Sequence, residues 1–374
     1  MTTLVSGAGW EPFVHGAGSL EPGSAGLAVH RYPANARVQV DDIMFRFAEA
    51  CPVGVSLRFV AKGEVELTIA ATTVMQDGGA APEVALMVRE GESERMLPLT
   101  DPSLIVIDGD ATVREMRPRP PQTVRLTAAS GGTVEVLLPH NARVELVALA
   151  ADGGIEPWPA AGLRWTHYGS SISQGLNAVS ASRTWPVAAA AQLGWRLRNL
   201  SIAGNAQLDG FAARVIRDQP ADLITLKAGI NLVNADSMRE RTFRPAVHAF
   251  LDTIRERQPD TPIVLISALS CPIHEDSPGP VVTGEDGRAR AARRAVEGDT
   301  GALTLSRSRE ILAEIVAARG DDRLAYWDGR ELLGAADSNA LYDGLHPDQG
   351  GLDLIADRFV AGIRERAGMG PADI

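Results

Sequence analysis

The stretch LRWTHYGSSISQG, residues 163–175, begins with β-strand character and breaks at a glycine into two adjacent serines. A glycine-rich turn after the first strand of an α/β domain can hold a phosphate on backbone N–H groups, or it can expose a nucleophile. The stretch matches neither the GxGxxG nor the Walker pattern, and GxSxG fails because Ser173 stands two residues after Ser171. The local sequence therefore leaves both uses open, together with that of an ordinary loop.

From residue 163 onward, strand-like and helix-like patterns alternate along the chain. The clearest helical segment, residues 244–258, has apolar residues at the i, i+3, i+4 and i+7 positions and Pro245 at its start. A second helical segment, residues 351–366, follows later in the chain. Such alternation predicts a parallel sheet with helices on both faces, whose ligands bind at the carboxyl ends of the strands. The candidate strands are residues 163–168, 196–200, 223–227, 263–268 and 324–327.

The region before this one has a different hydrophobic period. Between about residues 36 and 149, apolar residues alternate with polar ones or form short bursts, and turn sequences such as QDGG and ASGGT separate them. This pattern predicts an all-β sandwich, jelly-roll-like, of roughly eight short strands with almost no helix. Residues 151–162 are rich in glycine and proline and indicate a boundary. We therefore expect a β-sandwich domain over residues 1–155 and an α/β domain over residues 156–374.

The composition is that of an ordinary globular protein of about two domains. The chain has 374 residues, 45% of them apolar, and a formal net charge of -11. Acids and bases are mixed along the chain, so we expect no nucleic-acid partner. No stretch reaches the about 18 apolar residues that a membrane-spanning helix needs, and the start MTTLVSGAGWEPF lacks the pattern of a signal peptide. We expect a cytoplasmic protein without a membrane partner.

A second motif lies close to the end of the chain, in LYDGLHPDQGG, where Asp343 precedes His346 by three residues. In a helical or tight turn this spacing places both side chains on one side, so that the carboxylate can reach the imidazole. The other histidines show no paired spacing for metal ligands, and Cys51 and Cys271 fit neither a zinc site nor a disulfide framework. We expect no metal and no cofactor.

Two further strand ends carry groups that could donate hydrogen bonds to an oxyanion. Gly204, in NLSIAGNAQ, follows the second predicted strand, where a bare backbone N–H can approach a ligand closely. Asn231, in ITLKAGINLVN, follows the third, where its amide NH₂ can point into the same crevice. Each has an ordinary alternative, Gly204 as a turn and Asn231 as a helix cap. Their shared location at strand ends favours an acyl-transfer site.

The blocks GSSISQG, AGN, GIN and DGLHP, in this order, resemble the four sequence blocks of the SGNH, or GDSL-type, esterases and lipases. The resemblance covers roughly residues 160–367 and implies the three-layer hydrolase fold of that family. It implies that Ser171 is the nucleophile and that Asp343 and His346 complete a catalytic triad. It also implies an oxyanion hole made by the backbone N–H groups of Ser171 and Gly204 and by the Asn231 side chain.

Two positions depart from the family pattern. Ser170 stands where the family usually has an aspartate, and Leu232 replaces the aspartate that often follows the block-three asparagine. Neither position supplies the nucleophile, the base or an oxyanion donor, so the reaction is expected to remain. A substrate carried over from better-matched members is put in doubt.

The resemblance implies hydrolysis of a small-molecule ester through an acyl-enzyme, with acyl transfer to a hydroxyl of a natural product as the alternative. The two-domain layout is similar to an actinobacterial subgroup that includes acyltransferases of antibiotic biosynthesis. A third interpretation, a flavodoxin-like phosphate-binding protein, leaves Asp343 and His346 without a task.

The predicted N-terminal domain is poor in aromatic residues. Between Phe59 and Trp158 there is no aromatic residue, which argues against stacking on sugar rings. A structural role for this domain, including a homodimer contact, is therefore preferred.

The segment of residues 271–301 is too long for an ordinary strand-to-helix loop. We expect either a solvated loop or a lid beside the crevice where the acyl-enzyme would form, with the triad and the oxyanion hole outside this segment.

Overall fold

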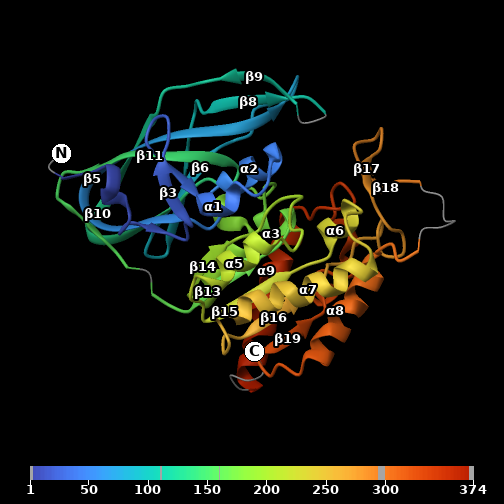
Figure 1. The fold of residues 1–374 in the computed structure, drawn as a ribbon. Helices are drawn as coiled ribbons and strands as arrows, with labels where there is room; N and C mark the ends of the chain where they lie inside the picture. Colours follow the sequence, from blue (N-terminus) through green and yellow to red (C-terminus); the bar gives the residue numbers. More distant parts are fainter. Residues whose placement is uncertain (1–2, 110–111, 160, 294–299, 370–374) are drawn as a thin grey trace. The chain divides into compact units, whose positions relative to one another are not determined.

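The computed structural model describes residues 3–109, 112–159, 161–293 and 300–369. The chain folds into two compact units (Figure 1). One unit comprises residues 1–162 and 179–182, and the other comprises residues 163–178 and 183–374. Over the described ranges, no helix combines the length and the apolar character needed to cross a membrane.

The first unit is built on β5 (Ser56–Gln76), which is flanked by β10 (Gln122–Leu137) and β11 (Ala142–Ala151). The strand order is β3-β4-β11-β5-β10-β6-β7, and the remaining strands pair at the sides of this path. Short helices lie between β4 and β5: α1 (Ala34–Arg37) and α2 (Ile43–Ala50). The other elements are β1 (Thr3–Val5), η1 (Gly7–Trp10), β2 (Val14–His15), β3 (Ser19–Pro22), β4 (Leu27–His30), β6 (Ala85–Glu90), β7 (Ser93–Pro98), β8 (Ser103–Ile107), β9 (Val113–Arg117) and β12 (Ile155–Pro157).

The all-β prediction for this region is confirmed, but the strands differ in number and length from those expected. Two predicted pairs of short strands are single long strands, because the turn-like residues between them stay extended. In β10 the break is a bulge between Ala128 and Gly132, which bends a strand without ending it. The expectation of almost no helix missed α2. Asp42 caps that helix by accepting a hydrogen bond from the Phe45 backbone N–H.

The second unit has a five-stranded parallel sheet in the order β14-β13-β15-β16-β19. Helices α4 (Trp185–Leu193) and α9 (Gln349–Met369) cover one face, where Trp165 of β13 stacks on Phe359 of α9. Helix α7 (Glu240–Arg255) covers the other face, where Tyr168 packs against Phe250. The strands are β13 (Arg164–Tyr168), β14 (Arg196–Asn199), β15 (Leu223–Lys227), β16 (Ile263–Ile266) and β19 (Leu324–Trp327), with a separate hairpin of β17 (Val281–Thr283) and β18 (Ala289–Ala291).

The predicted α/β alternation is confirmed, since each of the five predicted strands is present. Helix α7 begins at Glu240, earlier than predicted, so Pro245 lies inside the helix. The Thr242 side chain accepts a hydrogen bond from the Arg239 backbone N–H and starts the helix before the proline. The helices are α3 (Ser171–Gln174), η2 (Ala181–Arg183), α4 (Trp185–Leu193), α5 (Gly210–Arg217), α6 (Ile230–Asn234), α7 (Glu240–Arg255), α8 (Leu305–Arg319), η3 (Gly329–Glu331), η4 (Ala335–Ala340) and α9 (Gln349–Met369).

Candidate active site

The two adjacent serines occupy different environments at the carboxyl end of β13. Ser170 is fully buried and precedes α3, whereas Ser171 is partly exposed and begins this short helix. Gly169 must be a glycine, because a Cβ there would lie 2.6 Å from Ser173 Oγ. Gly175 ends the helix with φ of 69°, a left-handed conformation that glycine adopts without strain. The turn therefore presents one of the two serines, Ser171, to solvent.

A chain of hydrogen bonds joins Ser171 to His346 and Asp343. Ser171 Oγ lies 2.9 Å from His346 Nε2, and His346 Nδ1 lies 2.7 Å from Asp343 Oδ2. Asp343 Oδ1 also accepts hydrogen bonds from the backbone N–H groups of Leu345 and His346. Burial alone would raise the pKa of Asp343, but these hydrogen bonds outweigh it and lower the pKa to about 2. The carboxylate is therefore ionised at neutral pH and orients the imidazole.

The segment that carries the acid and the histidine is a tight loop before α9. A bridge joins Leu341 to Pro347, and the Tyr342 N–H donates to the His346 carbonyl at 3.1 Å. The Tyr342 ring stacks beside the His346 ring, with centroids 6.4 Å apart. Its hydroxyl accepts a hydrogen bond from Asn177 Nδ2 at 2.7 Å. Sequence analysis did not identify Tyr342 and Asn177, because only the fold brings these two distant residues into contact.

Two neighbouring segments hold residues 341–347, the candidate catalytic loop, from outside. In the hairpin, Ala289 N–H donates to the Asp343 carbonyl at 2.8 Å, and Arg288 Nη1 donates to the Tyr342 carbonyl at 3.2 Å. Cys271 Sγ contacts the Gly344 carbonyl at 3.6 Å. The hairpin therefore contacts this loop through Arg288 and Ala289, in agreement with the expected location beside the crevice, and its role as a lid stays a prediction. Residues 294–299 of the predicted lid lie outside the described residues.

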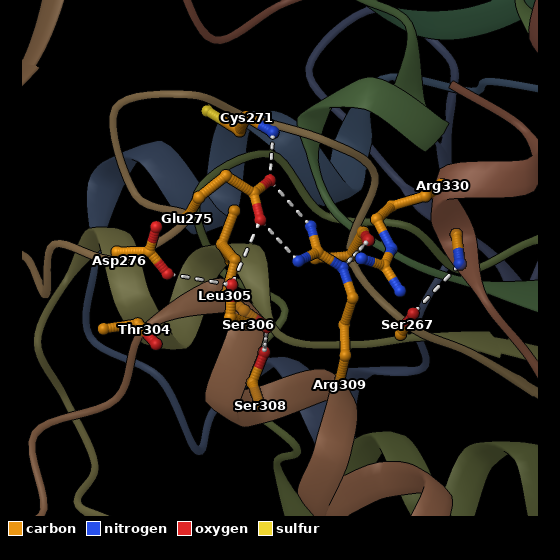
Figure 2. Close-up of polar contacts among 12 residues, drawn as sticks. Ser267, Cys271, Glu275, Asp276, Thr304, Leu305, Ser306, Ser308, Arg309 and Arg330 are labelled. Atoms are coloured by element: carbon orange, nitrogen blue, oxygen red, sulfur yellow. Dashed lines mark hydrogen bonds and ion pairs between the residues drawn. The ribbon is translucent and has the colours of Figure 1, made fainter. Parts of the chain in front are cut away.

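Cys271 is itself held by a partly buried ion pair (Figure 2). Arg309, from α8, makes two contacts with the Glu275 carboxylate and also donates to the carbonyls of Ala268 and Leu269. Glu275 in turn accepts from the Cys271 backbone N–H at 2.8 Å. Burial would raise the pKa of Glu275, but the Arg309 guanidinium and the Cys271 N–H lower it overall. This pair, which sequence reasoning missed, keeps the segment after β16 in place beneath the catalytic loop.

Gly204 and Asn231 belong to two loops that are tied together. Asn231 is buried, and its Oδ1 accepts from the Ala206 backbone N–H at 3.1 Å, which leaves Nδ2 as the donor end. Gly204 has φ of 70°. The Gln174 side chain accepts from the Ala203 N–H at 2.7 Å and so connects the Gly204 loop to α3. Among the described residues, no backbone carbonyl of the turns and loops accepts a hydrogen bond from the Gly204 N–H or from the Ser171 N–H.

A cluster of buried polar groups lies next to the serine turn. Lys227, the last residue of β15, is 2% exposed, and burial lowers its pKa to about 8. Burial also lowers the pKa of His167, and the positive charge of Lys227 lowers it further. Over the described ranges, four side-chain atoms here have no hydrogen-bond partner. These atoms are His167 Nε2, Ser170 Oγ, Ser173 Oγ and Lys227 Nζ.

Fold and site together define an α/β protein with a hydroxyl, an imidazole and a carboxylate in hydrogen-bonded sequence at the carboxyl edge of a parallel sheet. The chain belongs to the GDSL-like Lipase/Acylhydrolase family, whose sequence model matches residues 167–354. It is thus a member of an ester-hydrolysing enzyme family, and the phosphate-binding interpretation loses its support. In the described ranges, no three His, Cys, Asp or Glu side chains gather as metal ligands.

Solved structures share the fold over both units. A salicylyl-acyltransferase from a tetracycline biosynthetic pathway, SsfX3, is 24% identical with a TM-score of 0.78, covering 99% of this chain and 98% of its own. A GDSL-like lipase from Bacteroides ovatus is 16% identical with a TM-score of 0.63, covering 97% of both chains. A family two carbohydrate esterase from Cellvibrio japonicus is 15% identical with a TM-score of 0.55, covering 98% of both. No curated protein sequence matches.

Proposed function

We propose that this protein is a serine esterase in which Ser171 is the nucleophile, His346 the general base and Asp343 the residue that orients the histidine. The observation that carries the proposal is the unbroken path from Ser171 Oγ through His346 to the Asp343 carboxylate. Ser171 is also partly exposed, so an ester can reach it. An activated serine needs this combination of a neighbouring base, an oriented imidazole and access.

The reaction then proceeds in two halves. His346 Nε2 takes the proton from Ser171 Oγ as the oxygen attacks the ester carbonyl, and the same proton is given to the departing alcohol. Asp343 stabilises the imidazolium that exists between these two transfers. Water then attacks the acyl-enzyme while His346 takes its proton, the carboxylic acid leaves, and His346 returns the proton to Ser171 Oγ.

The negative charge on the tetrahedral intermediate needs donors that are in place beforehand. We assign this task to the Ser171 N–H, the Gly204 N–H and Asn231 Nδ2. Support comes from the loop ties, since Gln174 and Ala206 hold the Gly204 loop against α3 and Asn231. A flip of the Asn231 amide would break the hydrogen bond from the Ala206 N–H, so this bond favours the orientation in which the NH₂ is left for the oxyanion.

The direct test uses a fluorophosphonate probe, which reacts with an activated serine regardless of the substrate. We expect labelling at Ser171, identified by peptide mapping, and no labelling of Ser171→Ala. The matched control is Ser170→Ala, which removes the adjacent buried hydroxyl and should keep the labelling. Labelling of another serine, or none in folded protein, would overturn the assignment.

A second candidate is acyl transfer to an alcohol, favoured by the likeness to a salicylyl-acyltransferase over nearly the whole chain. The same acyl-enzyme would serve, with a hydroxyl in place of water. The discriminating measurement is the ratio of ester formed to acid released from one acyl donor as acceptor alcohols are added. A ratio that follows only the molar excess of alcohol over water would indicate an esterase.

Other expectations remain proposals. We propose a cytoplasmic location, which fits two cysteines that are both buried free thiols. We also propose that residues 1–155 form an accessory domain and residues 156–374 the hydrolase domain. Light scattering of the purified protein tests whether it forms a homodimer, and limited proteolysis tests the boundary.

A further inference from the structure

The hairpin of β17 and β18 places an arginine directly against the catalytic loop. Arg288 follows Gly287, which has φ of 74° in the turn, and its side chain is exposed. Arg288 Nη1 donates to the Tyr342 carbonyl at 3.2 Å. Arg288 Nη2 lies 3.7 Å from the point that a Cβ on Gly344 would occupy. The guanidinium therefore lies beside residues 342–344 of this loop.

The charge of Arg288 differs from that of the next arginine on the same hairpin. Arg290 Nη2 pairs with Asp286 Oδ2 at 2.8 Å, so its charge is locally compensated. Among the described residues, no carboxylate lies within ion-pair distance of the Arg288 guanidinium. The nearest acid of the loop, Asp343, is engaged by His346 and by two backbone N–H groups.

The guanidinium of Arg288 also keeps most of its donors available. One of its five N–H donors is used by a backbone carbonyl, and the planar group can still bind a carboxylate through two parallel hydrogen bonds. The protein as a whole has a net charge of -11, which repels anions at long range. A local cation beside the site is then the feature that would select an anionic substrate.

We propose that Arg288 is a specificity-determining residue that binds an anionic group, such as a carboxylate, carried by the ester substrate. The proposal rests on the proposed esterase function and names the substrate class for that site. Arg288 contacts the carbonyl of Tyr342, the residue before Asp343, so the proposal places the anionic group at the guanidinium while the ester carbonyl is at Ser171. Neutral esters would lack this contact and be poorer substrates.

The test compares kcat/KM for matched anionic and neutral esters. The anionic charge is placed on the acyl side in the p-nitrophenyl monoester of adipic acid, against p-nitrophenyl hexanoate. It is placed on the leaving side in para-acetoxybenzoate, against its methyl ester. We expect the wild-type protein to prefer the anionic ester of one pair by about tenfold or more, the size of a charge-assisted hydrogen bond. The pair that shows the preference identifies which side of the ester Arg288 faces.

Variants connect this preference to Arg288. Arg288→Gln should lower the anionic-to-neutral ratio about tenfold, mainly through KM, whereas Arg288→Lys, which keeps the charge, should retain part of it. Arg290→Gln, on the same hairpin, is the matched control and should leave the ratio unchanged. Added salt should reduce the wild-type ratio, because a partly exposed ion pair is screened.

Three outcomes overturn the proposal: no anionic preference in wild-type protein, an equal loss for anionic and neutral esters in Arg288→Gln, or an equal change in Arg290→Gln. An equal loss would make Arg288 a residue that only positions the catalytic loop. The fluorophosphonate result separates the two proposals. Labelling at Ser171 without anionic preference rejects this inference alone, and absent labelling rejects the esterase as well.

Discussion

The two units bury a cation in opposite ways. In the β-rich unit, Arg31 is completely buried and donates to the carbonyls of Ala48 and Cys51, at the C-terminal end of α2. In the α/β unit, Lys227 is almost as deeply buried, but no described residue accepts a hydrogen bond from its Nζ. One cation is satisfied by a helix end, while the other lies unpaired beside the serine turn.

Arg31 therefore stabilises the structure, whereas Lys227 lowers its stability at a position near the candidate active site. A buried cation that meets backbone carbonyls offsets its desolvation and holds a helix in place. A buried cation without a partner lowers the stability of the fold. Unpartnered polar atoms gather around the Ser170 and Ser171 turn, where functional sites tolerate such costs. The predictions below test this contrast, beginning with the largest effect.

If the polar groups of the candidate site serve catalysis, replacing them should lower turnover more than stability. Asp343→Asn should lower kcat by up to about 10⁴, because the amide selects the wrong histidine tautomer. The Asn oxygen can still accept from the Leu345 and His346 N–H groups, so the melting temperature should change little. The matched control is Asp337→Asn, which removes an acid paired with Arg358 away from the site and should leave kcat unchanged. Near wild-type turnover in Asp343→Asn would show that this acid only shapes the turn.

Asn231 offers the next largest effect. Asn231→Ala should lower kcat by about 10² to 10³ with KM little changed, since the oxyanion exists in the transition state and not in the bound ester. Asn234→Ala, at the end of the same helix α6, is the control for disturbance of the helix. Steady-state kinetics with p-nitrophenyl acetate provide the measurement. A change in KM alone would indicate that Asn231 binds the ground state or caps the helix.

Arg31→Met should destabilise the β-rich unit by about 3 kcal/mol, because two carbonyls at the end of α2 lose their donor in a buried position. The kcat of the folded protein is expected to stay unchanged. Arg46→Met, which removes an exposed pair with Asp41, is the control and should cost less than about 1 kcal/mol. Urea unfolding followed by circular dichroism measures both. Equal losses in the two variants would contradict the structural role of Arg31.

Replacing Lys227 by methionine should instead stabilise the folded protein near neutral pH. The pKa of Lys227 is lowered from 10.5 to about 8, so below pH 8 the charged ammonium destabilises the folded protein. Between pH 8 and 10.5 the unfolded chain alone holds this proton, so wild-type stability should rise relative to Lys227→Met across that window. The full difference is about 3 kcal/mol, and it appears below pH 8 as greater stability of Lys227→Met.

The chain allows a clean control for this experiment. Lys62 and Lys227 are its two lysines, and Lys62 is exposed. NMR of ¹³C-labelled lysine would follow both titrations in one sample, with Lys62 as the internal reference. Lys62→Met should show no such pH-dependent change in stability. A normal pKa for Lys227, or lower stability of Lys227→Met at neutral pH, would mean that the ammonium is satisfied in solution.

The sequence alone determined what depends on short-range order. Each of the five strands of the parallel sheet was predicted from the alternation of strand-like and helix-like segments, and the three-residue spacing predicted that Asp343 could reach His346. Both are local, since the hydrophobic period decides the element and the turn decides the spacing. The four family blocks likewise led to Ser171, Gly204 and Asn231 as candidate residues of the site.

Only the tertiary structure decided which distant groups meet. The hairpin strand β18 reaches Asp343 from more than fifty positions earlier in the chain, and Arg309 pairs with Glu275 from another element. Neither segment carries a periodic pattern that names its partner. Whether a buried cation finds acceptors, as Arg31 does, or finds none, as Lys227 does, depends on the backbone that packs around it. Hydrophobic patterning specifies which face is buried, whereas polar pairing depends on the positions of individual atoms that only the complete fold brings together.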